Sequence, residues 1–257
     1  MTASILNHPL ISERYFFPRP DSFERPFWVD CGPVRLGCYY HHQHPNAKTV
    51  VHFHGNGEVV SDYLADFVPA IDRLGYNCFL AEYRGYGMST GRPALVEMLA
   101  DVEQIIPAIG QPPEKMVLFG RSVGSIYALH GASCFPNIAG LIIESGIADP
   151  LERLLLRVHP QEVGAIDEQI RVVVDRELNH QAKLAKFKGA ALIMHTRHDG
   201  LVDVSHAQRL YQWAPQPKTL KIFEQGSHND ILFVNFAEYF QTVQAFMQGL
   251  PAYPATG

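Results

Sequence analysis

The stretch that most constrains the fold of this chain runs from Val117 to Gly124 and reads V-L-F-G-R-S-V-G. Its apolar first half is typical of a buried strand, and a small-residue helix pattern continues after it. A serine at the apex of such a strand–turn–helix unit, here Ser122, occupies a strained turn that exposes its hydroxyl. Only glycine at Gly120 and Gly124 lets the strand and the helix pass closely beneath it.

The same turn indicates which groups surround the serine. The backbone amide of Val123 is expected to face the space where an oxyanion would form. Ser125 is the nearby alternative nucleophile, but it lies one turn into the helix and has no flanking glycine geometry. We therefore expect Ser122 to be the reactive hydroxyl of this segment.

The composition is that of a globular protein with a sizeable core, because 47% of the 257 residues are hydrophobic and 18% are charged. We expect residues 1–257 to form one domain with an insertion. The net charge of −5 and the lack of a long basic run argue against nucleic acid or an anionic membrane surface as a partner. The N-terminus lacks a signal-peptide pattern and no apolar run is long enough for a membrane span, so a cytoplasmic setting is expected.

Neither the cysteines nor the histidines form a metal-binding pattern. The cysteines have no C-x-x-C pair, which favours buried free thiols at Cys31, Cys38, Cys78 and Cys134. Three histidines gather in one expected loop, at His41, His42 and His44, without a nearby cysteine or paired carboxylate. We therefore expect no metal and no organic cofactor.

Strand patterns recur along the chain and alternate with helix patterns. After an irregular, aromatic-rich arm over residues 1–26, the expected strands cover residues 27–30, 34–40, 49–53, 77–82, 116–119, 138–143, 190–195 and 219–223. Helices are expected over residues 58–74, 92–106, 126–133, 205–213 and 231–247. The first two strands suit an antiparallel hairpin, and the later strand–helix units predict right-handed crossovers in a parallel sheet. The expected fold is α/β, a mostly parallel twisted sheet of about eight strands with helices on both faces.

The alternation breaks between Ile147 and about Lys188, where only helical spacings of apolar residues occur. A block inserted at the carboxyl end of a parallel sheet lies where ligands bind in open α/β folds. Residues 147–188 are therefore expected to form a small helical lid. The alternative is that these apolar stripes only pack against the domain core.

Three polar residues follow three of the expected parallel strands, in the order Ser122, Asp199, His228. A serine hydroxyl is a weak nucleophile until an imidazole takes its proton, and the imidazole needs a carboxylate to fix its tautomer. All three side chains are expected at the carboxyl edge of the sheet. Asp203 is the alternative acid, although it is closer to a helix start and could cap that helix.

Two glycine-containing loops complete the candidate site. His54-Gly55-Asn56-Gly57 follows the strand 49–53, and its glycines would let backbone amides face inward and supply a second oxyanion donor. A plain strand-to-helix turn is the equally good alternative on the local sequence. In the second loop, residues 83–91, we expect Arg84 to fix the loop by hydrogen bonds rather than to hold substrate.

Taken together, H-G-N-G at 54–57, Y-R-G-Y-G-M-S at 83–89, G-R-S-V-G at 120–124, the block from Asp199 and Gly226-Ser227-His228 resemble the α/β-hydrolase superfamily. The resemblance is to small serine hydrolases that carry H-G-N-x-G and Y-R-G-Y-G motifs, and it covers nearly all of residues 27–248. It implies Ser122 as nucleophile, His228 as general base and Asp199 as acid. It also implies an oxyanion hole formed by the amides of Asn56 and Val123. Lipases, esterases and protein depalmitoylases are relatives of this group.

The sequence departs from this pattern at Arg121, a charged residue expected at the mouth of the site, and at Glu58, an acid expected near the oxyanion hole. Both would limit anionic substrates or select a polar head group. His198 also precedes Asp199, where a glycine-rich loop is more usual. The leading functional hypothesis is a serine hydrolase that cleaves carboxylic esters or thioesters of a small-molecule or acylated substrate through an acyl-enzyme. The alternative is a hydrolase-like scaffold that binds a small ligand or partner without turnover. An aspartate nucleophile, as in epoxide hydrolases of this fold, is disfavoured by Ser122.

Overall fold

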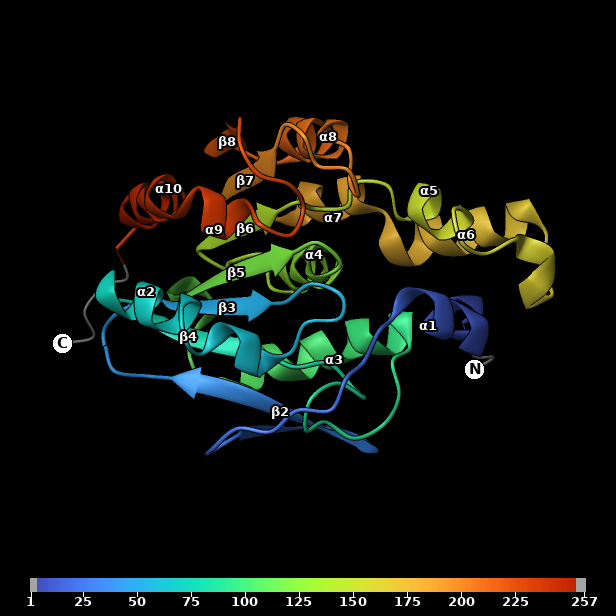
Figure 1. Ribbon diagram of the computed structural model, residues 1–257, viewed down its shortest axis with the longest axis horizontal. Helices are drawn as coiled ribbons and strands as arrows, with labels where there is room; N and C mark the ends of the chain where they lie inside the picture. Colours follow the sequence, from blue (N-terminus) through green and yellow to red (C-terminus); the bar gives the residue numbers. More distant parts are fainter. Residues whose placement is uncertain (1–3, 253–257) are drawn as a thin grey trace.

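The protein, described over residues 4–252 in a computed structural model, is built on a single twisted sheet (Figure 1). Its strands lie in the order β1-β2-β4-β3-β5-β6-β7-β8. Their bounds are β1 Phe27–Cys31, β2 Val34–His41, β3 Thr49–Phe53, β4 Asn77–Ala81, β5 Met116–Arg121, β6 Gly140–Glu144, β7 Ala190–Thr196 and β8 Lys218–Phe223. The strands agree with the expected ones to within two residues at nearly every end.

The sheet is antiparallel at one edge and parallel elsewhere. β1 and β2 form the expected hairpin and β2 pairs antiparallel with β4, whereas β4, β3, β5, β6, β7 and β8 pair in parallel. Phe53 at the end of β3 pairs with Gly120 near the end of β5, so the loops that follow these two strands begin side by side. This is the α/β-hydrolase fold, and the fold expected from the sequence is confirmed.

Two apolar clusters cover the two faces of the sheet. α3, α4, α7 and α8 contribute to one cluster, and α2, α9 and α10 contribute to the other. The helices and helical turns are η1 Ile5–Asn7, α1 Pro9–Tyr15, η2 Val60–Tyr63, α2 Phe67–Arg73, α3 Leu95–Ala108, η3 Pro113–Lys115, α4 Gly124–Cys134, α5 Pro150–Leu155, η4 Pro160–Val163, α6 Asp167–Leu178, α7 His180–Lys186, α8 Ser205–Trp213, α9 Ile231–Val234 and α10 Phe236–Gln248.

Within the described part of the N-terminal arm, residues 5–15 are not irregular, because they form η1 and α1, whereas residues 16–26 have no helix or strand, as expected. The imidazole Nδ1 of His8 accepts a hydrogen bond from the amide of Leu10, and Pro9 occupies the first position of α1, both of which favour a helix start. Leu6 and Ile11 are fully buried in the cluster that also includes residues of α5 and α6. α1, α5 and α6 therefore lie together beyond the carboxyl ends of β3 and β5 (Figure 1).

Two expected helices are interrupted. The helix expected over residues 58–74 is split into η2 and α2, because Pro69 would clash with the carbonyl four residues earlier and fits only in the first turn of α2. The closing helix is split at Asn235, whose side-chain amide donates to the carbonyls of Ile231 at 2.9 Å and Gln225 at 3.0 Å. Such side-chain bonds to the backbone compete with helix continuation. By contrast, α3 continues through Pro107, which lies in its last turn.

The closest approach between strand and helix is at the glycines of the serine turn. A Cβ atom on Gly124 would overlap the carbonyl oxygen of Phe53, and one on Gly120 would lie 2.6 Å from the carbonyl oxygen of Gly124. Both contacts are shorter than atoms tolerate, so neither position accepts a side chain without a backbone shift. These contacts fix where α4 begins relative to β3 and β5.

Replacing Gly124 by alanine should destabilise the fold strongly. We expect Gly124→Ala to lower the free energy of unfolding by about 3 kcal/mol or more, because backbone atoms of β3 would have to move. The matched control is Gly200→Ala, whose added Cβ meets nothing within 4 Å and should change stability by less than about 0.5 kcal/mol. Urea denaturation of both variants measures the difference, and equal stabilities would contradict the packing argument.

Candidate active site

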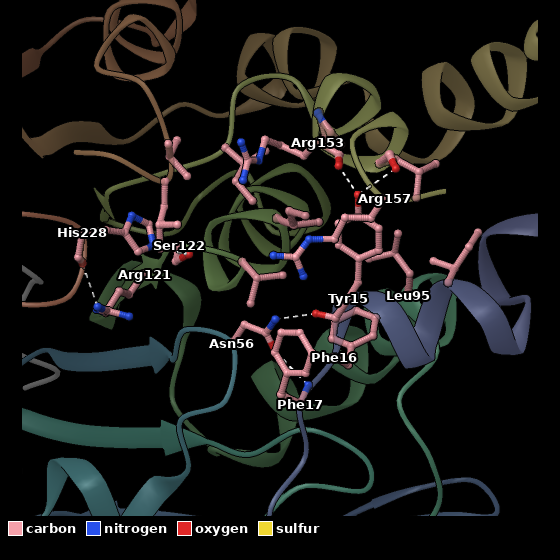
Figure 2. Close-up of a pocket in the computed structure, with 18 of the residues that line it drawn as sticks. Tyr15, Phe16, Phe17, Asn56, Leu95, Arg121, Ser122, Arg153, Arg157 and His228 are labelled. Carbon is pink, nitrogen blue, oxygen red and sulfur yellow. Dashed lines mark hydrogen bonds between the residues drawn. The ribbon is translucent and has the colours of Figure 1, made fainter. Parts of the chain in front are cut away.

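The structure brings Ser122, His228 and Asp199 into one hydrogen-bonded chain. The Nε2 atom of His228 lies 2.8 Å from the Oγ atom of Ser122, and its Nδ1 atom lies 2.7 Å from Oδ2 of Asp199. The three residues follow β5, β8 and β7, at the carboxyl ends of parallel strands. Figure 2 shows Ser122 and His228 together on one side of a pocket. The three side chains therefore meet at the carboxyl edge of the sheet, where the sequence placed them.

The serine turn has the strained backbone that its sequence indicates. Ser122 has a φ of 53°, in the left-handed region that residues with a side chain rarely adopt. Its amide donates to the carbonyl of Glu144 at 2.9 Å, which holds the turn against β6. The hydroxyl of Ser125 donates to the carbonyl of Ser122 at 2.6 Å and accepts from the amide of Ile147 at 3.0 Å. Ser125 thus braces the turn rather than facing His228.

Of the two candidate carboxylates, Asp199 is the one that contacts His228. Its Oδ1 accepts from the amides of Leu201 and Val202, each at 2.8 Å. Burial raises the pKa of Asp199, but the hydrogen bonds from His228 and from these amides outweigh burial, so the pKa lies below its ordinary value. Asp203 instead accepts from the amide of Ser205 at 2.9 Å at the start of α8. Asp203 therefore caps the helix, which was the alternative role that its sequence position allowed.

The two amides implied as an oxyanion hole are free to bind a ligand. Within residues 4–252, neither the backbone amide of Asn56 nor that of Val123 donates a hydrogen bond to the protein. The side chain of Asn56, by contrast, is bonded to the protein through both its oxygen and its nitrogen. Its Oδ1 accepts from the amide of Phe17 at 3.0 Å and the hydroxyl of Tyr86 at 2.9 Å, and its Nδ2 donates to the carbonyl of Tyr15.

A buried ion pair supports the loop that carries Asn56. The Nε2 atom of His54 lies 2.7 Å from Oε1 of Glu82, and its Nδ1 lies 2.8 Å from the carbonyl oxygen of Gly55. Burial alone would lower the pKa of His54, but the charge and hydrogen bond of Glu82 outweigh burial and raise it. The other Glu82 oxygen accepts from the amide of Val60 at 3.1 Å. The two ends of the loop are therefore held by one carboxylate.

Arg121 and Glu58 pair with each other and are not free charges, so the expectation that they limit or select the substrate is wrong. Arg121 is buried, forms an ion pair with Glu58, and its Nε lies 3.1 Å from Oε1 of Glu144. Its Nη2 donates to the carbonyl oxygen of His228 at 2.9 Å. Glu58 also accepts from the amide of Gly55 at 2.6 Å. The pair consequently ties the His228 loop to the Asn56 loop.

A cavity of about 270 Å³ opens beside Ser122. Its walls come mainly from α1, α5, the start of α4 and the His228 loop (Figure 2). The apolar part of the lining includes Ile11, Phe16, Leu95, Ile126, Leu154 and Leu178, and its polar part includes Tyr15, Arg153 and Arg157. The sequence reasoning missed these last three. The four-residue spacing of Arg153 and Arg157, which places two side chains on one helical face, was the available signal.

Clusters of metal-ligand residue types lie elsewhere. Both His41 and His44 contact Oδ1 of Asp72, at 2.8 Å and 3.0 Å, so the histidine-rich segment has a carboxylate partner that its sequence neighbourhood did not indicate. In the described part of the chain, the group whose geometry could hold a metal ion is a different one, formed by Glu103, His130 and Cys134, whose ligand atoms lie within 4.8 Å of one another. None of these residues lines the cavity beside Ser122.

Residues 4–252 also show the contacts of Arg84, the state of the cysteines and the character of the helices. Arg84 forms two hydrogen bonds with Asp101, at 2.7 Å and 2.6 Å, and so fixes its loop to α3 as expected. Three cysteines are buried and free, at Cys31, Cys38 and Cys78, whereas Cys134 is exposed. No helix between residues 4 and 252 has the length and apolar character needed to cross a bilayer.

This fold defines the protein as a member of the α/β-hydrolase superfamily. More particularly, residues 44–172, about half of the chain, match the family described as Serine aminopeptidase, S33, and the chain belongs to that family. It is 27% identical over 217 residues to alpha/beta hydrolase domain-containing protein 17C of Xenopus tropicalis, covering 82% of this chain and 66% of that protein. The human protein of the same name is 26% identical over 218 residues, covering 83% of this chain and 62% of that protein. The chain thus spans slightly less than two thirds of these relatives.

Solved structures with the same fold include esterases. The Pyrococcus furiosus esterase Pf2001 superposes with a TM-score of 0.70 at 17% identity, covering 92% of this chain and 97% of that one. Est1E from Butyrivibrio proteoclasticus, solved with ferulic acid bound, gives a TM-score of 0.71 at 17% identity, covering 86% and 98%. At this identity the likeness concerns the fold alone.

The buried network around Arg121 should matter for stability. We expect Arg121→Met to lower the free energy of unfolding by about 3–5 kcal/mol, because it leaves the buried carboxylate of Glu144 and the partly buried one of Glu58 without their cation. The control is Arg197→Met, which breaks an ion pair with Glu224 between side chains that are 51% and 66% exposed and should cost about 0–1 kcal/mol. Chemical denaturation measures both, and a cost for Arg121→Met no larger than for the control would refute the role of the network.

Proposed function

We propose that this protein is a serine hydrolase that cleaves carboxylic esters or thioesters through an acyl-enzyme intermediate. The observation that carries the proposal is the hydrogen-bonded chain from Ser122 through His228 to Asp199 at the edge of a largely apolar cavity. A serine hydroxyl, an imidazole and a buried carboxylate in this order are the elements needed for acyl transfer.

In the proposed mechanism, Oγ of Ser122 attacks the carbonyl carbon while its proton passes to Nε2 of His228. Asp199 holds the imidazole in the required tautomer and stabilises the cation that forms. The negative charge that develops on the carbonyl oxygen is bound by the amides of Asn56 and Val123. Collapse of this intermediate expels the alcohol or thiol, which takes the proton from His228. Water then attacks the acyl-enzyme by the same route and releases the carboxylic acid.

The cavity favours an ester or thioester over a peptide with a free amino terminus. An enzyme that acts on an amino terminus needs an anionic or carbonyl-rich group to hold the ammonium ion. No aspartate or glutamate among the described residues lines the cavity, whereas Arg121, Arg153 and Arg157 do. The family description names an aminopeptidase, but this cationic wall is a poor receptor for an ammonium group.

We further propose that the chain forms one domain with a helical lid within residues 147–188. α5 and α6 lie beyond the sheet and contribute Pro150, Leu154 and Leu178 to the cavity wall. α7 instead packs against α4 on the face of the sheet. The covering part of the lid is therefore α5, η4 and α6. A small-molecule or acylated substrate would enter between this part and the His228 loop.

Removing the nucleophile tests the proposal directly. We expect Ser122→Ala to lower the turnover of p-nitrophenyl esters by about a million-fold, because the residues of such a triad act as a unit. Ser133→Ala, which removes a hydroxyl bonded to the carbonyl of His130 in the last turn of α4, is the control and should retain turnover. The wild type is assayed on p-nitrophenyl esters from acetate to palmitate. The acyl chain length with the highest turnover indicates how long a chain the cavity accepts.

A fluorophosphonate probe supplies a readout independent of substrate choice. Intact mass should show one adduct on the wild type and on Ser133→Ala, and none on Ser122→Ala. If the wild type neither hydrolyses the esters nor takes up the probe, the protein is a binding scaffold and the proposal fails.

The two aspartates provide a second test. Asp199→Asn should lower kcat by about four orders of magnitude, because an amide stabilises the wrong tautomer of His228. Asp203→Asn should keep kcat within a few-fold, because asparagine also caps helices well. Steady-state kinetics on the best ester measures both. A large loss in Asp203→Asn with little loss in Asp199→Asn would reverse the assignment of the acid.

A further inference from the structure

The cavity beside Ser122 carries an excess of positive charge that the ester chemistry does not require. Three of its lining residues are arginines, and none of the described lining residues is acidic. In Figure 2, Arg153 and Arg157 lie on the wall across the pocket from His228. Both belong to α5 and the turn that follows it, in the proposed lid.

Two of the three arginines are occupied by the protein itself. Arg121 pairs with Glu58 and Glu144. Arg157 donates to the carbonyl of Arg14 at 2.8 Å, and its guanidinium lies 5.4 Å from the centroid of the Tyr15 ring and 5.7 Å from that of Phe17. Through these contacts, the guanidinium of Arg157 holds the proposed lid against α1 and the residues that follow it.

Arg153 is different, because its guanidinium has no hydrogen-bond or ion-pair partner among residues 4–252. The adjacent acid, Glu152, lies 3.4 Å from Arg209 and 3.6 Å from His206 and so faces away from the cavity. Arg153 is itself only partly exposed. A guanidinium with five N–H donors that is half-buried and unpaired is a receptor for an anion that the protein does not supply.

The backbone of Arg153 is nevertheless held firmly. The hydroxyl of Tyr15 donates to the carbonyls of Arg153 and Leu154, the latter at 2.7 Å. Arg14 forms a two-pronged ion pair with Glu162 in η4 and donates to the carbonyl of Arg157 at 2.6 Å. The segment that presents Arg153 is thus clamped to α1, while the end of its side chain stays available. Because the backbone of this segment is already fixed, less conformational entropy is lost when a ligand binds to Arg153.

We propose that Arg153 is the recognition residue for an anionic group of the substrate, so that the preferred ester or thioester combines a hydrocarbon portion with one carboxylate or phosphate. The proposal rests on the hydrolase function proposed above. A guanidinium fork pairs with two oxygens of either anion, and its interaction is stronger beside the apolar side chains of this cavity than in bulk water. Arg157 adds a second positive charge on the same wall, and the apolar lining accepts the hydrocarbon portion.

The test compares esters that differ in one charged group. The first pair is p-nitrophenyl octanoate and the p-nitrophenyl monoester of octanedioic acid, which places a carboxylate on the acyl side. The second set has the octanoyl ester of methyl p-hydroxybenzoate as its neutral member, with the esters of p-hydroxybenzoate and p-hydroxyphenyl phosphate as anionic members. The readout is the ratio of kcat/KM for the anionic member to that for the neutral one, because a ratio is independent of the fraction of active enzyme.

We expect the wild type to favour an anionic ester in at least one of the two sets. The favoured set shows whether the anion lies on the acyl side or on the leaving group. Within the second set, the favoured member shows whether the anion is a carboxylate or a phosphate. Arg153→Met should lower that ratio by about tenfold to a hundredfold, mainly through KM, as expected for a lost charged hydrogen bond. Arg153→Lys should lower it less, since it keeps the charge but loses the fork. Arg176→Met, which removes an arginine that is 61% exposed on α6, should keep the wild-type ratio.

The outcomes separate the two proposals. If the wild type hydrolyses the neutral esters through Ser122 but favours no anionic member, or if Arg153→Met leaves the ratio unchanged, the anion site is refuted and the hydrolase function stands. If the wild type hydrolyses no ester of either set, the anion site is refuted. If it also takes up no fluorophosphonate probe, or if Ser122→Ala matches it, the hydrolase function is refuted as well.

Discussion

The close packing of β5, β3 and α4 is the constraint on which the rest of the candidate site depends. Because Gly120 and Gly124 have no side chains, α4 begins directly against the carbonyl of Phe53, and the turn between strand and helix is forced into the strained conformation of Ser122. The pairing of Phe53 with Gly120 then makes the loop after β3 the neighbour of that turn. The loop that carries Asn56 and the turn that carries Val123, two separate parts of the chain, thereby begin side by side.

Buried charged groups fix the Asn56 loop and the His228 loop, which the packing of β3, β5 and α4 alone would not hold in place. Glu82 fixes both ends of the Asn56 loop through His54 and Val60, and Arg121 connects that loop to the carbonyl of His228 through Glu58. Charged groups in the interior are costly unless they are paired and hydrogen-bonded, so a network of this kind constrains each member to one geometry. The position of His228 relative to Ser122 is therefore set from beneath the site as well as by Asp199.

The sequence was sufficient to predict what depends on local pattern. Strand and helix periodicity located the sheet, and the glycines around Ser122 together with the strand-following positions of Asp199 and His228 predicted which side chains meet. It failed where a partner is distant along the chain. Nothing near His41 and His44 indicated Asp72, and nothing near Arg121 indicated that Glu58 would neutralise it. The break at Pro69 was readable, because proline has a local effect, but the helix in the N-terminal arm depends on burial of Leu6 and Ile11 against residues of α5 and α6.

That distant packing separates the chemistry of this protein from its selectivity. Ser122, Asp199 and His228 belong to loops set by the sheet, whereas the cavity wall is formed where α1 meets α5, and Tyr15 holds the backbone of Arg153. α1 lies outside the part of the chain that matches the family, residues 44–172, and so do Asp199 and His228. Substitutions in α1 or α5 can therefore change which side chains line the cavity beside the hydroxyl of Ser122 without moving the sheet. One fold can serve many substrates for this reason, and the substrate is better inferred from the wall opposite His228 than from the three residues beside it.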